Sequence, residues 1–279
     1  MIRKSGLVVG LLFICQTASA AIQYEFQQVT RSDISSEPPS QYTGRAVIDG
    51  DRSRVDIISG NTYTPGVYVI STNGSRTLMF VDPTKKIYAE VNAGSVAAAV
   101  GSSNINIENL NSSTNKLDDH PVIAGVPTDH YRLTLNYDIT FMMGTISLKQ
   151  NVHTTVDKWT TVIFGDISEA FLANSGVRTG NPKLDEIIQI ETTKIKGFPL
   201  REQMQTITTG MRNAASTALA REGGYSRTRT QTRDITITSI HQADVGGNTF
   251  TVPSNYHKAE SGDDEKLAQT QVQTLSMEP

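Results

Sequence analysis

The chain has 279 residues and a formal net charge of −3, a balance that excludes the strongly basic surface typical of nucleic-acid binding. Its length is sufficient to bury the core of one domain. The single cysteine, Cys15, excludes an internal disulfide, so the fold has to be stabilised by core burial.

The first twenty residues are typical of an export signal. Arg3 and Lys4 provide the basic start, residues 6–14 form the apolar core, and Ala18-Ser19-Ala20 matches the small-x-small cleavage pattern. We therefore expect cleavage after Ala20 and a periplasmic protein of the bacterial envelope. No later stretch is apolar and long enough to predict a transmembrane segment.

Cys15 offers an alternative processing route, in which it is lipidated instead of removed. The bulky Phe13 and Ile14 before it fit that route poorly, so cleavage after Ala20 is the prediction. Cleavage removes Arg3 and Lys4 but no acidic residue, which changes the net charge from −3 to −5.

The mature chain begins with a strand, because apolar and polar residues alternate from Ile22 to Phe26. Residues 42–91 then have the pattern of short antiparallel strands joined by tight turns. Asp49-Gly50-Asp51 and Asn73-Gly74 supply the positive backbone angles that hairpins need. Several of these strands are apolar on both faces, which predicts a sheet covered on both sides in its middle.

Residues 92–120 are rich in Asn and Ser, so we interpret them as an irregular insertion, in which Ile105 and Ile107 could add an edge strand. Strand periodicity returns at residues 131–137, where every second residue is apolar and one face belongs to the core. The strand pattern continues through Ile146 and Leu148 to the only tryptophan, Trp159.

An amphipathic helix is predicted from Asn181 to Lys196. Asn181 is a suitable N-cap, Pro182 suits the first helical position, and Gly197 ends the helix. Its apolar stripe includes Ile187 and Ile188 and has to pack on the sheet. A shorter helix is expected at 168–176.

The rest of the chain is predicted as strands at 199–209, 226–240 and 250–253, an irregular excursion at 210–225 and a disordered tail at 258–279. The predicted organisation is a signal peptide at 1–20, a single domain at 21–257 and the tail.

No catalytic, nucleotide-binding or cofactor motif is present, so we assign no catalytic residue, no cofactor and no metal. One polar cluster could bind a divalent metal or serve a hydrolase. A polar loop is the simpler interpretation of its members, which are Asp118, Asp119, His120, Asp129 and His130.

Five arginines concentrate positive charge near the end of the domain. An exposed hairpin tip is the simpler interpretation, and contact with an anionic lipid or an acidic partner is the alternative. These residues are Arg212, Arg221, Arg227, Arg229 and Arg233.

Five short motifs occur in a fixed order along the chain: Asp49 to Arg54, Val81 to Tyr88, Trp159 to Thr161, Gly197 to Leu200 and Phe250 to Pro253. In this order they resemble a bacterial family of exported domains of unknown function, which is similar to the periplasmic lipoprotein-carrier (LolA/LolB-like) superfold. The resemblance implies an α+β, mostly β fold: a curved antiparallel half-barrel covered on its concave side by a few helices. It also implies a hydrophobic cavity.

The leading hypothesis is a non-enzymatic envelope protein that binds a lipid, lipoprotein or other hydrophobic ligand. The alternatives are a module with a filled core that binds another envelope protein, and, third, a hydrolase. The residues expected to contact the ligand are Tyr131, Leu133, Leu135, Tyr137, Ile146, Leu148, Trp159, Ile187 and Ile188.

The mature protein is predicted to begin at Ala21. Mass spectrometry of the protein isolated from the periplasm should give the mass of residues 21–279. A diacylated Cys15 at the N-terminus, or a chain that retains Met1, would contradict the predicted cleavage.

Overall fold

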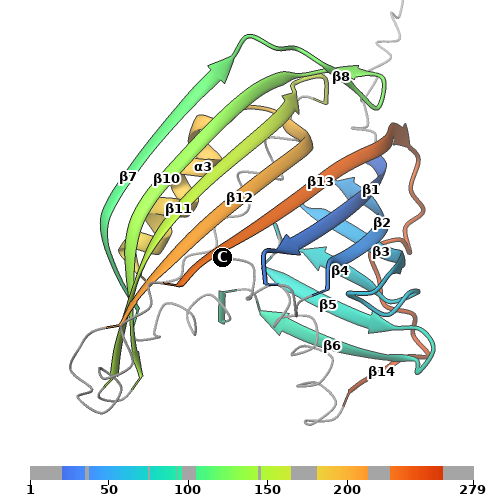
Figure 1. The fold of residues 1–279 in the computed structure, drawn as a ribbon. Coiled ribbons are helices and arrows are strands. Elements are labelled where there is room, and N and C mark those ends of the chain that lie inside the picture. Colours follow the sequence, from blue (N-terminus) through green and yellow to red (C-terminus); the bar gives the residue numbers. More distant parts are fainter. Residues whose placement is uncertain are drawn as a thin grey trace, which may run out of the picture.

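The computed structural model describes residues 21–34, 38–74, 76–92, 94–95, 105–143, 146–164, 181–212 and 227–259 (Figure 1). Most of these residues belong to one curved twelve-stranded sheet, with the strand order β14-β6-β5-β4-β3-β2-β1-β13-β12-β11-β10-β7. All neighbouring strands are antiparallel except β14 and β6, which are parallel. The prediction of a mostly β fold with a curved antiparallel sheet is confirmed.

Six strands form a meander in the first half of the described chain: β1 (Ala21–Ser32), β2 (Ser40–Asp49), β3 (Arg52–Gly60), β4 (Tyr68–Thr72), β5 (Thr77–Asp82) and β6 (Ile87–Asn92). The expected turns have the backbone angles that hairpins require, with φ of 59° at Gly50 and 62° at Gly74.

The middle of the meander is buried on both faces, as predicted. Successive residues Phe80 and Val81 point to opposite faces of β5, and each is 1% exposed. Phe250 and Tyr256, from the segment that leads to β14 (His257–Lys258), pack in the cluster that contains Val81. The predicted strand at 250–253 is wrong, because this segment covers the sheet instead of joining it.

The second half of the sheet consists of β7 (Ile105–Leu117), β10 (Asp129–Met143), β11 (Ile146–Thr161), β12 (Phe198–Arg212) and β13 (Arg227–Ala243). A small hairpin of β8 (Val122–Ile123) and β9 (Val126–Pro127) precedes β10. The predicted strand with one core face and one solvent face is confirmed in β10, where Leu133 and Leu135 are buried while Arg132 and Asn136, which flank them, are exposed.

The helix α3 (Pro182–Lys194) begins as predicted and ends two residues before the predicted end at Lys196. The side chain of Asn181 accepts hydrogen bonds from the backbone N–H groups of Lys183 and Leu184. Ile187, Ile190 and Ile195 pack with Leu133 of β10 and Val156 of β11. We call the face of the long strands that contacts α3 the helix face, and the opposite one the polar face (Figure 1).

Two other expectations differ from the structure. Within the irregular insertion expected at 92–120, the possible edge strand at Ile105 and Ile107 is present but extends over residues 105–117 as β7, paired with β10. Within the described residues α3 is the one complete helix, so the expectation of several helices is not confirmed. No helix in this part of the chain combines the length and apolar character needed to cross a membrane.

Some predictions fall on residues that the structure does not describe. These are the signal peptide at 1–20, the short helix at 168–176, most of the excursion at 210–225 and the predicted tail from 260 onward. The predicted start of that tail at 258 is wrong, because Lys258 belongs to β14 and the N–H of Ala259 donates to the carbonyl oxygen of Tyr88.

Gly197 fixes the passage from α3 into β12. Its φ is +90°, and a Cβ there would lie 2.6 Å from the carbonyl oxygen of Thr161. We expect Gly197→Ala to lower the free energy of unfolding by about 1–3 kcal/mol more than Gly66→Ala does. Gly66 is a matched control, because its φ is +91° and a Cβ added to it would meet no atom within 4 Å. Urea unfolding of the two variants measures the difference, and equal losses would contradict the close contact.

Candidate functional site

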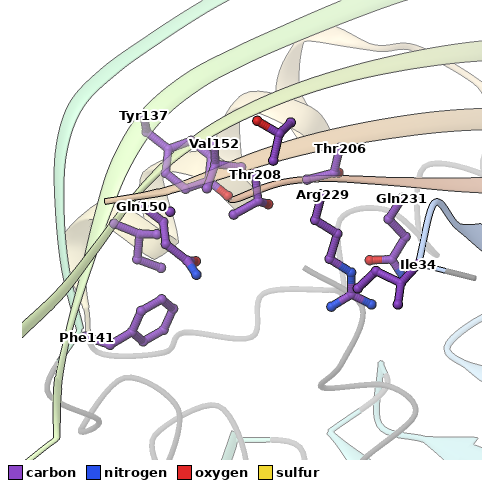
Figure 2. A pocket seen from close by; sticks show the side chains of 12 residues that line it. Ile34, Tyr137, Phe141, Gln150, Val152, Thr206, Thr208, Arg229 and Gln231 are labelled. Atoms are coloured by element: carbon purple, nitrogen blue, oxygen red, sulfur yellow. The ribbon is translucent and has the colours of Figure 1, made fainter. Parts of the chain in front are cut away.

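A cavity of about 390 Å³ lies on the helix face of the long strands. Figure 2 shows the side chains around it. The described residues that line it are Ile34, Tyr137, Ile139, Phe141, Gln150, Val152, Thr206, Thr208, Gly210, Thr228, Arg229 and Gln231.

One side of the cavity is mainly apolar. Tyr137, Ile139 and Phe141 occupy alternate positions of β10, so the period of the strand places all three on the same face. Val152 of β11 is the direct partner of Tyr137 and continues this surface. Burial raises the pKa of Tyr137, so its phenol remains a neutral hydrogen-bonding group.

The other side of the cavity is polar. Thr208 of β12 pairs with Arg229 of β13, and Thr206 pairs with Gln231. Figure 2 shows Arg229, Gln231 and Ile34 together, across the cavity from Phe141. Among the described lining residues, Arg229 carries the one charged side chain.

The cavity borders the filled core beneath α3. Leu133 and Leu135 lie on the same face of β10 as Tyr137, but they are only 1% and 6% exposed because Ile187, Ile190 and Ile195 cover this part of the sheet. Tyr137, Ile139 and Phe141 are partly exposed. The apolar face of β10 therefore passes from packed core to cavity wall at Tyr137.

Of the described residues predicted to contact a ligand, Tyr137 alone lines the cavity. Tyr131, Leu133, Leu135 and Ile187 belong to the core cluster beneath α3. Leu148 pairs with Phe141 but is not among the lining residues. The side chains of Ile146 and Ile188 lie outside the described parts of the structure.

Trp159 is separated from the other predicted residues because it lies on the polar face. Its ring stacks on His130 with a centroid distance of 4.2 Å, and its indole N–H donates to Asp119. The two nitrogens of His130 lie 2.6 Å from Asp119 Oδ1 and 2.9 Å from Asp157 Oδ1. The hydrogen bond with His130 holds the pKa of Asp119 below its usual range.

The polar cluster considered as a metal or hydrolase site is divided into two parts. His130 contacts Asp119, whereas His120 Nδ1 lies 3.2 Å from Asp129 Oδ1, and Lys116 Nζ contacts the other oxygen of Asp129. In the portion of the chain that is described, no group of three or more His, Cys, Asp or Glu side chains could hold a metal ion.

The expected arginine cluster is also divided. Arg233 forms an ion pair with Glu202 at 2.8 Å, and Lys158 contacts the same carboxylate at 2.9 Å. Burial by itself raises the pKa of Glu202, but these two cations hold it below the ordinary value. Arg229 lines the cavity. The side chains of Arg212, Arg221 and Arg227 are outside the described parts.

The sequence interpretation missed most of the cavity because it ended the strand at Tyr137. The structure extends β10 to Met143. The alternation of Tyr137 with Ile139 and Phe141 was the available signal for this extension. Arg229 reaches the cavity lining because β13 pairs with β12, and no short sequence pattern predicts that pairing.

Comparison with known proteins gives a structural likeness. No known family model matches the chain, and no curated protein matches it. Among solved structures, the chain is similar to the crystal structure of a LolA superfamily protein from Nitrosomonas europaea. The two chains are 13% identical in sequence, and their superposition has a TM-score of 0.30. It covers 84% of this chain and 90% of the other. The sequence motifs resemble the same superfamily, but at this TM-score the functional proposals rest on the geometry of the present chain.

Asp138 is the centre of a second hydrogen-bond network on the polar face. Asn151 and Asn109 donate to its two oxygens, and Lys149 lies 3.1 Å away. These contacts lower the pKa of Asp138 from 3.8 to about 2. The stabilisation by the carboxylate is therefore complete above pH 4 and is lost as the pH falls toward 2.

We expect Asp138→Asn to lower the free energy of unfolding at pH 7 by about 1 kcal/mol. The difference from wild type should shrink as the pH falls from 4 toward 2. Urea unfolding across this range measures it, with Asp51→Asn in an exposed turn as the control. A difference that is independent of pH would show that the charge of Asp138 contributes nothing.

Proposed function

We propose that this chain is an exported envelope protein that binds a hydrophobic ligand without transforming it. The observation that carries the proposal is the partly exposed apolar wall formed by Tyr137, Ile139, Phe141 and Val152. The ligand lies in the cavity between this wall and Arg229. Export depends on residues 1–20, as the sequence pattern predicts.

The contrast along β10 supports a binding site over a packing defect. Leu133 and Leu135 are covered by α3, whereas the same face remains open from Tyr137 to Phe141. Exposing apolar side chains to water costs about 25 cal/mol per Å² of apolar surface. An apolar ligand that covers this surface therefore gains binding free energy. A concave, largely apolar surface with a few polar groups is the usual form of a small-molecule site.

The chemistry of the lining supports binding over catalysis. Its described side chains include no Ser, Cys, His, Asp or Glu, which are the common nucleophiles and general bases. Thr206 and Thr208 are hydroxyl groups without an adjacent base among the lining residues. Their role in the proposal is to donate hydrogen bonds to a ligand.

A protein-binding module with a filled core is the second candidate. The packed cluster of Leu133, Leu135 and Val156 beneath α3 is the observation in its favour. This candidate requires that the cavity beyond Tyr137 takes up no ligand, which is a measurable difference between the two functions.

We predict that Ile139→Gln weakens the binding of the neutral fluorescent probe N-phenyl-1-naphthylamine by about tenfold, because a polar group replaces part of the apolar wall. Ile207→Gln is the matched control: Ile207 is also partly buried but occupies the polar-face register of β12, between the cavity residues Thr206 and Thr208. Probe fluorescence titrated with protein gives both dissociation constants.

The two variants separate the candidate functions. Weaker binding by Ile139→Gln alone supports a ligand in the cavity. Equal binding by the wild type and both variants would place the probe elsewhere, and failure of the wild-type protein to bind any apolar probe would favour the module with a filled core.

A further inference from the structure

We propose that a pH-dependent latch holds the β8–β9 hairpin against the domain, and that it opens when His130 loses its proton. The latch consists of the imidazole of His130 and the carboxylates of Asp119 and Asp157. None of these three residues lines the cavity, so the inference is independent of the proposed ligand.

The contacts of His130 require its charged form. Its Nδ1 lies 2.6 Å from Asp119 Oδ1, and its Nε2 lies 2.9 Å from Asp157 Oδ1. An imidazolium has two N–H donors, whereas a neutral imidazole has one and would place a bare nitrogen against a carboxylate oxygen. The side chain of His130 is 7% exposed, so water has little access to replace the missing donor.

The two carboxylates differ in how firmly they are held. Asp157 belongs to β11, its side chain is 15% exposed, and it also accepts hydrogen bonds from Nε and Nη2 of Arg132 at 2.8 and 3.0 Å. Asp119 follows the end of β7, and its side chain is 55% exposed. Neutral His130 therefore keeps its one N–H on Asp157, and the carboxylate of Asp119 moves into water.

The contact between Asp119 and His130 closes the base of the segment that carries the hairpin. Asp119 lies between β7 and β8, and His130 is the second residue of β10. Within this segment the backbone N–H and the hydroxyl of Thr128 both donate to the carbonyl oxygen of Pro121. The hairpin packs on a buried apolar cluster through Ile123, Ala124 and Val126.

Release of Asp119 loosens the whole hairpin. The strands β8 and β9 have two residues each, and an isolated two-stranded hairpin is marginally stable at best in water. Its order depends on the apolar cluster and on the contact at its base. An open latch therefore exposes the apolar side chains of the hairpin and the part of the cluster near Phe198 and Leu200.

The charged groups on β12 and β13 are separated from His130 by an aromatic ring. The strand register places His130, Trp159 and Arg201 in one row, with Trp159 in the middle. The guanidinium of Arg201 lies 5.0 Å from the centre of the Trp159 ring, and its Nη2 lies 3.7 Å from Asp234 Oδ2. Their charges therefore act on His130 less directly than the two carboxylates that contact it.

The neighbouring carboxylate of Asp129 belongs to a separate group. Lys116 Nζ lies 2.9 Å from its Oδ2, and His120 Nδ1 lies 3.2 Å from its Oδ1. Asp118, beside Asp119, is exposed. A change in the charge of His120 therefore alters a contact of Asp129 and leaves the contact of Asp119 in place, which makes His120 a suitable control.

The direction of the pH dependence follows from these contacts. The hydrogen bond with His130 holds the pKa of Asp119 below its usual range, so this carboxylate stays charged in mildly acidic solution. His130 is protonated under the same conditions, and the latch is closed. As the pH rises, His130 releases its proton and the stabilisation of the hairpin is lost.

Trp159 reports the charge of His130. It is the only tryptophan of the chain, and its ring stacks on the imidazole with a centroid distance of 4.2 Å. A charged imidazole quenches the fluorescence of an indole on which it stacks. The emission of the full mature protein should therefore rise between pH 5 and pH 9, and His130→Gln should abolish this rise.

Hydrogen exchange measured by mass spectrometry reports the hairpin itself. Protection of residues 122–128, relative to the unfolded-chain rate at the same pH, should be about tenfold lower at pH 9 than at pH 5 in the wild type. The reason is the loss of a charge-assisted hydrogen bond. The strands β10 and β11 should keep their protection, which shows that the domain remains folded.

Two variants separate the latch from a purely structural role. Asp119→Asn should lower the protection of the hairpin at pH 5 to about the wild-type value at pH 9. Its fluorescence should still rise with pH, because His130 remains beside Trp159. His120→Gln removes a histidine outside the latch and should behave as the wild type does in both measurements.

Hairpin protection that does not change with pH in the wild type would overturn the inference. This holds even if the fluorescence rises, because His130 would then titrate without releasing Asp119. Equal protection of the wild type and Asp119→Asn at pH 5 would overturn it as well. Because the side chain of Asp119 is exposed, this variant tests the latch even if His130→Gln fails to fold.

Discussion

The strands β10 to β13 are much longer than the one helix described against them, and this difference in length determines where a site can form. The sixteen residues of β11 extend over roughly 50 Å, whereas the thirteen residues of α3 span about 20 Å. Strand periodicity keeps one face of β10 apolar along its length. The helix covers that face at Leu133 and Leu135, so the continuation from Tyr137 to Phe141 is left as a cavity wall.

The rest of the sheet provides the polar side of this cavity. β13 pairs with both β12 and β1, so it joins the long strands to the meander. The meander is packed on both faces, with Phe80 and Val81 almost fully buried, and forms a rigid support for β13. This connection holds Arg229 opposite the apolar wall, and the strand register, rather than any loop, sets the distance between the two ends of the cavity.

Local signals predicted individual elements better than they predicted the site. Asn181 indicated the start of α3, Gly197 indicated the turn that follows it, and the Asp-Gly and Asn-Gly turns indicated the hairpins, because each depends on a few adjacent residues. Only the start of β7, at Ile105 and Ile107, was anticipated as an edge strand, because an edge strand in contact with water tolerates the Asn and Ser residues that follow. Trp159 and Leu148 were predicted to contact the same ligand, but they occupy an odd and an even position of β11 and therefore point to opposite faces of the sheet. The partners of Arg229 depend on contacts between distant segments, which no local pattern reveals.

The central claim is that a ligand enters the part of the helix face that α3 leaves uncovered. Methyl NMR spectra of the full mature protein, recorded during titration with dodecanoate, test it most directly. The account predicts shifts at Ile34, Ile139 and Val152, which line the cavity, with little change at Leu133 or Ile207. Shifts confined to the exposed Val162 and Ile163, with none at the cavity residues, would contradict it.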